Sequence, residues 1–150
     1  MKIEEALKVQ KFNSAAKRAI VNVLYTGYWL SDRVNEQLKP FGISEQQYNV
    51  LRILRDQKTH SFNLCSIQER MMHKMSNATR LVEKLRLKDL VTRETNEDNR
   101  RMVEIDITEK GMKLVEKIEK KLAEYNCGFD DKLTEKEYVQ LANLLDKLRD

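Results

Sequence analysis

The chain has 150 residues, of which 41% are hydrophobic and 35% charged, with one proline and four glycines. This length is typical of one domain, and the composition indicates a soluble, mainly helical protein and excludes a disordered or collagen-like chain. The net charge of +4 does not by itself indicate a nucleic-acid partner.

The sequence contains no stretch near the roughly 20 apolar residues of a membrane span, and its first residues lack the apolar core of a signal peptide. Cys65 and Cys127 lie far apart, with no CxxC motif and no Cys/His ligand set. This spacing argues against a disulfide framework and a structural zinc site. We therefore expect a cytoplasmic protein without membrane contact, metal or cofactor.

Apolar residues at steps of three and four, from Phe12 to Leu38, predict one long helix. Pro40 ends it, because proline cannot continue the hydrogen-bond ladder. Ser44 and Gln47 form the S-x-x-Q pattern of a capping box and predict a second helix of about three turns.

Leu64, Ile67 and Met71 form a short apolar stripe that predicts a third helix of about two turns. HKMS then interrupts the stripe, and Ser76 or a neighbour is the expected N-cap of a fourth helix. That helix has an apolar inward face, and its other face carries Asn77, Thr79, Arg80, Lys84 and Lys88.

The helical spacing of apolar residues ends at Leu90. The segment LVTRE is compatible with a β-strand, TNEDNRR is polar, and MVEIDI alternates apolar and polar residues. Val103, Ile105 and Ile107 share one face of the last segment, so the pattern predicts a β-hairpin.

Two further helices are predicted after the hairpin. Thr108 is the expected cap of the first, with Glu109 in its first turn. Residues 126–132 break that helix, and Thr134 and Glu137 form the capping box of the last one.

Positive charge is concentrated between Arg70 and Lys88, a segment that contains six basic residues and one acidic residue, Glu83. Two short helices with a tight turn, the second polar and basic outside, are typical of a unit that lays a recognition helix in the DNA major groove. Short polar side chains let the backbone approach, and Arg or Lys reaches guanine or phosphate. The expected DNA-reading residues are Lys74, Ser76, Asn77, Thr79, Arg80 and Lys84.

The polar hairpin loop is a candidate wing, because Arg100 and Arg101 are cations suited to the narrow, electronegative minor groove. Asn99 adds a polar contact or braces an arginine. Each signal alone also fits an ordinary solvated surface, and the combination in this order is what favours DNA binding.

Three stretches resemble MarR-type regulators: ISEQQYNVLRIL (43–54), SIQERMMHKMSNATRLVEKLRLKDLV (66–91) and NRRMVEIDITEKG (99–111). The family wing pattern is D-x-R, an aliphatic residue four positions later, then L-T-x-x-G. This chain has Asn99, Arg101 and Ile105, followed by ITEKG. Asn99 replaces the usual Asp, and Asp89 stands where a glycine usually ends the recognition helix in left-handed backbone.

The resemblance implies a mainly α fold with a small β-hairpin wing. It implies a single domain, 1–150, in which residues 41–108 form the winged helix-turn-helix lobe and residues 1–40 and 109–150 the dimerisation helices. The implied function is a homodimeric regulator, commonly a repressor, on a pseudo-palindromic operator in double-stranded DNA. The sequence supports the dimer, since we expect a partner chain to bury a set of apolar side chains far from the central core: Phe12, Ile20, Leu141, Leu145 and Leu148.

Relatives of this type often bind small aromatic or anionic effectors in a cleft between the dimerisation and DNA-binding regions. Tyr25, Tyr28, Trp29 and Tyr48 are the candidates for such a cleft, although aromatic residues at helical spacing also fit a core. Cys65 is expected to be a buried, inert thiol rather than a redox sensor.

We find no converging catalytic groups, and His60 and His73 have no nucleophile or carboxylate at a recognisable spacing. An enzyme is therefore not expected. The alternative is a winged-helix module that binds another protein without DNA, since a fold does not fix a function. The polar, basic helix face favours DNA over such a partner.

Overall fold

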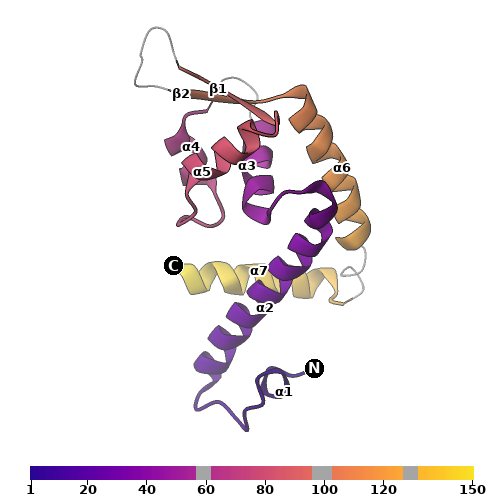
Figure 1. The fold of residues 1–150 in the computed structure, drawn as a ribbon. Coiled ribbons are helices and arrows are strands. Elements are labelled where there is room, and N and C mark those ends of the chain that lie inside the picture. The colour runs from indigo at the N-terminus through magenta and orange to yellow at the C-terminus, as the bar shows by residue number, and fades with distance from the viewer. Residues whose placement is uncertain (57–61, 96–102, 127–131) are drawn as a thin grey trace. The chain divides into compact units, whose positions relative to one another are not determined.

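The computed structural model describes residues 1–56, 62–95, 103–126 and 132–150. Figure 1 shows the helices and the two-stranded antiparallel hairpin. In chain order the elements are α1 (Ile3–Leu7), α2 (Ala15–Leu38), the 3-10 turn η1 (Lys39–Phe41), α3 (Glu45–Arg55), α4 (Leu64–Arg70), α5 (Ala78–Arg86), β1 (Val91–Thr95), β2 (Val103–Ile107), α6 (Glu109–Asn126) and α7 (Glu135–Arg149). The expected mainly α fold with a β-hairpin is confirmed. The chain forms two compact units, Met1–Glu45 and Gln46–Asp150.

In the first unit, the long helix begins later than its apolar pattern suggested. Ser14 is the N-cap of α2, and its Oγ accepts a hydrogen bond from the Lys17 backbone N–H at 3.1 Å. Phe12 therefore lies before the helix, and the predicted inclusion of Phe12 in it was wrong. The short helix α1 was not predicted, and a 2.6 Å ion pair from Arg18 to Glu4 ties it to α2. Pro40 lies in η1 and ends α2 as expected.

The second unit has its core between α3, α4, α5, the hairpin and α6. Leu51, Ile67, Val82, Leu85, Ile105, Val115 and Ile118 are completely buried there. Burial of this many branched side chains is the main favourable term in folding. The core sets the position of α5, whose outward face is the candidate site.

The hairpin pairs Val91 with Ile107 and Arg93 with Ile105. Ile105 is buried, and Val103 and Ile107 on the same face are partly buried, which confirms the predicted alternation. Phe62 adds an isolated bridge to Ile105, with backbone N···O distances of 3.1 and 2.8 Å. No sequence pattern predicts this bridge, because Phe62 lies in a polar stretch.

Within the described segments, no helix is long and apolar enough to cross a membrane.

Candidate nucleic-acid interface

Helices α4 and α5 each begin at an asparagine N-cap. Asn63 is the N-cap of α4, and its Oδ1 accepts from the Ser66 N–H at 2.8 Å. Asn77 is the N-cap of α5, and its Oδ1 accepts from the Arg80 N–H at 3.0 Å. The side-chain oxygen of Asn77, a predicted base-reading residue, is thus engaged in starting the helix.

Gln68 braces the turn between α4 and α5 in a way that the sequence did not indicate. Its Nε2 donates to the Lys74 carbonyl, and its Oε1 accepts from the Ala78 N–H at 3.3 Å. The Met72 N–H donates to Asn49 Oδ1 on α3 at 2.9 Å. These bonds hold the start of α5 against α4 and α3, and a polar residue on a short helix carries no sequence signature for such a role.

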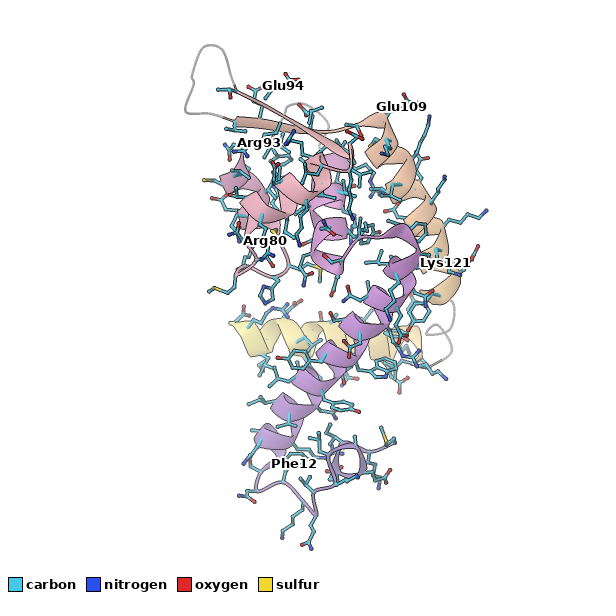
Figure 2. All side chains as sticks on the ribbon, viewed as in Figure 1. Phe12, Arg80, Arg93, Glu94, Glu109 and Lys121 are labelled. Atoms are coloured by element: carbon cyan, nitrogen blue, oxygen red, sulfur yellow. The ribbon has the colours of Figure 1, made fainter. Side chains whose placement is uncertain are left out.

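Helix α5 has two distinct faces. Ala78, Val82 and Leu85 are buried. Thr79, Arg80 and Lys84 are exposed, and Figure 2 shows Arg80 on this helix. The residues expected to read DNA from the helix therefore lie on its solvent face.

Several basic side chains in the segment from Arg70 to Lys88 already contact other groups of the protein. The Arg70 guanidinium lies 4.6 Å from the centre of the Phe62 ring. Lys74 Nζ donates to the Glu69 carbonyl, and Arg86 pairs with Glu83 at 2.8 Å. Within the described part of the chain, Arg80 and Lys84 form no ion pair. All six basic side chains of the segment are exposed, and of the three that make these contacts only Arg86 is paired with a carboxylate.

Ser76 and the wing residues complete the predicted set. Ser76 Oγ lies 3.2 Å from His73 Nδ1 in the turn before α5. Asn99, Arg100 and Arg101 lie outside the described residues.

Arg93 on β1 is an exposed cation that sequence reasoning missed (Figure 2). Its charge, after the stronger hydrogen bonds from Arg86, helps to hold the pKa of Glu83 below its usual range. Arg93 therefore lies close to α5 and adds to the positive potential there. The strand pattern LVTRE contained it, but only the hairpin register places it beside the helix.

The C-terminus of α5 confirms one sequence expectation. Asp89 has φ 59°, in the left-handed region, as expected for the position where relatives place glycine. The Asp89 N–H donates to the Arg86 carbonyl at 2.9 Å and the Leu90 N–H to the Leu85 carbonyl at 3.1 Å. This is the Schellman arrangement, so α5 ends at a fixed point.

The four aromatic candidates for an effector cleft lie in different units. Tyr25, Tyr28 and Trp29 lie on α2, where Tyr28 is 72% exposed and the Arg33 guanidinium lies 4.4 Å from the centre of the Trp29 ring system. Tyr48 lies on α3 and is buried. Burial, with a smaller contribution from Glu119, raises the pKa of Tyr48.

Cys65 is exposed on α4, so the predicted burial of its thiol was wrong. The helix turns this position away from the side that Ile67 buries. Cys127 lies outside the described residues. Across the described ranges, no three His, Cys, Asp or Glu side chains are grouped to hold a metal.

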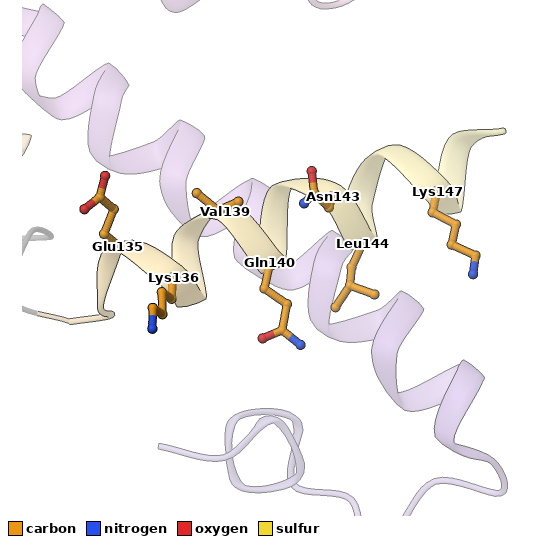
Figure 3. A pocket seen from close by; sticks show the side chains of 7 residues that line it. All are labelled: Glu135, Lys136, Val139, Gln140, Asn143, Leu144 and Lys147. Atoms are coloured by element: carbon orange, nitrogen blue, oxygen red, sulfur yellow. The ribbon is translucent and has the colours of Figure 1, made fainter.

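The terminal helix exposes a stripe of apolar side chains. Leu141, Leu144 and Leu148 on α7 are 44%, 57% and 58% exposed. An open hollow of about 570 Å³ follows the adjacent face of the helix and shares Leu144 with the stripe, and Figure 3 shows the side chains that line it. Of the other side chains that we expected a partner chain to bury, Ile20 is exposed, whereas Phe12 and Leu145 are partly buried. Exposed apolar stripes of this kind mark interaction surfaces.

The geometry defines a class of protein. Two short helices with a braced turn, the second polar and basic outside and followed by an antiparallel hairpin, form a winged helix-turn-helix. The MarR family model matches residues 43–103, which include α3, α4, α5 and β1. Over this segment the chain is similar to MarR-family regulators, and its fold is that of their solved structures.

Two curated relatives illustrate the similarity. The transcriptional repressor MprA of Escherichia coli is 27% identical over 89 residues, which cover 59% of this chain and 51% of MprA. The HTH-type transcriptional repressor MdtR of Bacillus subtilis is 29% identical over 113 residues, covering 75% of this chain and 72% of MdtR. The matched region spans about half the length of the E. coli relatives.

Solved structures share the fold. A MarR-like transcription regulator from Bacillus cereus matches with a TM-score of 0.77 at 19% identity, over 91% of this chain and 97% of that one. The S. aureus MepR–DNA complex matches at 0.76 and 21% identity, over 84% and 91% of the two chains. CouR from Rhodococcus jostii, bound to p-coumaroyl-CoA, matches at 0.75 and 20% identity, over 91% and 95%.

Proposed function

We propose that the chain is a sequence-specific regulator, a transcriptional repressor, that binds a pseudo-palindromic operator in double-stranded DNA as a homodimer. The observation that carries this proposal is α5, which a braced turn and a buried apolar face hold with Thr79, Arg80 and Lys84 outward. These side chains can reach base edges and phosphates in a major groove. The curated relatives MprA and MdtR are repressors, and MepR of the same fold is known bound to DNA.

The remaining predicted contacts belong to the same proposal. Lys74 and Ser76 precede α5 in the turn, and Asn77 presents the helix N-terminus. Asn99, Arg100 and Arg101 are the proposed wing contacts to the minor groove, and Arg93 adds positive charge at the base of the wing.

A protein-docking role for the same helix face is less well supported. Hot spots for protein partners are enriched in aromatic residues, and their surroundings exclude water. The sequence of α5, ATRLVEKLR, contains no aromatic residue, and its outward side is polar and cationic. That chemistry suits a polyanion.

Selection of bound duplexes from a random pool tests DNA binding, operator symmetry and half-site spacing together. Fluorescence anisotropy across a salt series then tests the residues. Arg80→Ala and Lys84→Ala should weaken binding, and each lost phosphate contact should reduce the salt slope by about 1. Lys117→Ala on α6, which removes the same charge from an exposed lysine outside the proposed interface, is the matched control. Wild-type affinity and salt slope in both α5 variants would refute the assignment.

The proposed dimer uses the apolar stripe of α7. Leu141 and Leu148 are seven positions apart and so share one face of the helix, whereas Asn143 lies on nearly the opposite face. Leu141→Glu with Leu148→Glu should convert the dimer into monomers in sedimentation velocity experiments. Asn143→Glu introduces one glutamate elsewhere on α7 and should leave the dimer intact. A monomeric wild-type chain at micromolar concentration would exclude the dimer.

We also propose that a small aromatic anion acts as effector near α2. Trp29 beneath the Arg33 guanidinium offers a flat apolar ring beside a cation, and CouR of the same fold carries p-coumaroyl-CoA. Tyr25, Tyr28 and Tyr48 remain proposed cleft residues.

Trp29 is the single tryptophan of the chain, so its fluorescence reports binding directly. Titration with p-coumarate or benzoate should change that fluorescence and weaken operator binding, and Arg33→Gln should reduce both effects. No fluorescence change at millimolar concentrations would refute this role.

A further inference from the structure

The Schellman turn at the end of α5 satisfies its own N–H groups but leaves three successive backbone carbonyls, those of Lys88, Asp89 and Leu90, to other donors. All three accept hydrogen bonds from the segment where α6 begins. Lys110 Nζ donates to the Lys88 carbonyl at 2.8 Å, and Thr108 Oγ1 donates to the Asp89 carbonyl at 2.8 Å. The Thr108 backbone N–H donates to the Leu90 carbonyl at 3.1 Å.

Thr108 acts on both helices at once. While its hydroxyl proton points to the Asp89 carbonyl, its Oγ1 accepts from the Gly111 N–H at 3.0 Å and so caps α6. The hydroxyl therefore fixes the first turn of α6 against the last turn of α5.

Gly111 allows this contact to be close. A Cβ atom at position 111 would lie 2.3 Å from the Leu90 carbonyl oxygen and 2.7 Å from Ile107 Cγ1. Hydrogen-bonded backbone at this distance has little freedom to tilt. We call this joint, residues 88–90 with 108–111, the clasp.

The clasp connects two parts with different proposed tasks. Helix α5 is the proposed recognition helix, and α6 opens the segment 109–150 that is expected to form the dimer. Chain connectivity alone does not fix the angle between them, because β1, the hairpin loop and β2 separate α5 from α6 in the sequence. The hydrogen bonds of the clasp are direct contacts between the two helix ends.

We propose that Thr108 and Lys110 are positioning residues that set the direction of α5 relative to α6, and thereby the half-site spacing that the dimer accepts. This inference rests on the proposed function, since spacing has meaning only for a dimer on DNA. Neither side chain needs to touch DNA in this role.

The test measures affinity for operators whose half-sites are separated by the selected spacing or by one base pair more or less. Thr108→Val removes the hydroxyl and keeps the shape, whereas Thr108→Ser keeps the hydroxyl. Lys110→Met removes the ammonium and keeps the apolar stem. Lys113→Met is the control, because Lys113 lies one turn further along α6 and pairs with Glu109 rather than with α5.

Thr108→Val and Lys110→Met should each bind the selected spacing about two- to tenfold more weakly, the range expected for one lost hydrogen bond. Their preference over the shifted spacings should shrink as well. Thr108→Ser and Lys113→Met should keep the wild-type spacing profile. Lys110→Met should also keep the wild-type salt slope, because the proposed role includes no phosphate contact. Lys110→Met retains the cap of α6, so it tests the clasp even where Thr108→Val lowers the folded population seen by circular dichroism.

Three results would overturn the inference. An unchanged spacing profile in folded Thr108→Val and Lys110→Met would show that the clasp does not set spacing. A reduced salt slope with a wild-type profile in Lys110→Met would assign Lys110 to a phosphate instead. A wild-type chain that binds no duplex would refute the proposed function itself and this inference with it.

Discussion

Gly111→Ala tests the close contact between α6 and the end of α5. Alanine is normally better than glycine inside a helix by about 1 kcal/mol. Here the added Cβ would lie 2.3 Å from a backbone oxygen, whereas favourable non-bonded carbon contacts begin at about 3.5 Å. The two groups must separate by roughly 1 Å, against backbone that the clasp holds. Overpacking of this kind costs about 1–3 kcal/mol, so we expect a net loss of stability.

Gly27→Ala is the matched control, because Gly27 also lies inside a helix, α2, and a Cβ there would meet nothing within 4 Å. This variant should be more stable than wild type by up to about 1 kcal/mol. Urea unfolding at equal protein concentration measures both variants, since the proposed dimerisation would make apparent stability concentration-dependent. The reasoning fails if Gly111→Ala is as stable as wild type. A loss of stability in Gly27→Ala would place a partner chain against that part of α2.

Three further outcomes are expected. Gln68→Ala removes the two hydrogen bonds that Gln68 makes across the turn. Their loss should reduce the free energy of unfolding by roughly 1–2 kcal/mol and the melting temperature by about 2–8 °C. An unchanged melting temperature and DNA affinity would contradict the brace. Glu137 accepts hydrogen bonds from the backbone N–H and the hydroxyl of Thr134, and these bonds lower the pKa of Glu137. The ionised carboxylate therefore stabilises the fold at pH values above the ordinary glutamate pKa of about 4.3. This contribution is lost as the pH falls through the lower pKa of Glu137 in the folded state. Glu137→Gln should therefore lose less stability than wild type between neutral and acid pH in denaturant titrations. Cys65 is exposed, so a Cys127→Ser variant should react with a thiol reagent while folded, and resistance until denaturation would show that Cys65 is covered.

The sequence predicted most elements because local signals are strong where they repeat. Helical spacing ended by Pro40, capping residues at Thr108 and Thr134, and strict alternation around Ile105 each indicated the observed structure. The left-handed backbone at Asp89 was also predictable, because a resemblance to relatives with glycine carries information about φ.

Features that depend on partners distant in sequence were not predictable. The brace by Gln68, the bridge at Phe62 and the position of Arg93 beside α5 arise from contacts that no local pattern encodes. The exposure of Cys65 failed as a prediction for the same reason, since a short helix buries only the positions that meet the core.

For this protein, the sequence alone determined the order of the elements from α2 onward and the polar, basic character of the α5 surface, because periodicity, caps and charge are local properties of the chain. The tertiary structure decided that Arg93 lies near α5 and how α5 is joined to α6. The joint depends on contacts between residues 19 to 22 positions apart, namely Thr108 with Asp89 and Lys110 with Lys88. Packing of the shared core brings those segments together, and only then do their hydrogen bonds fix the end of α5.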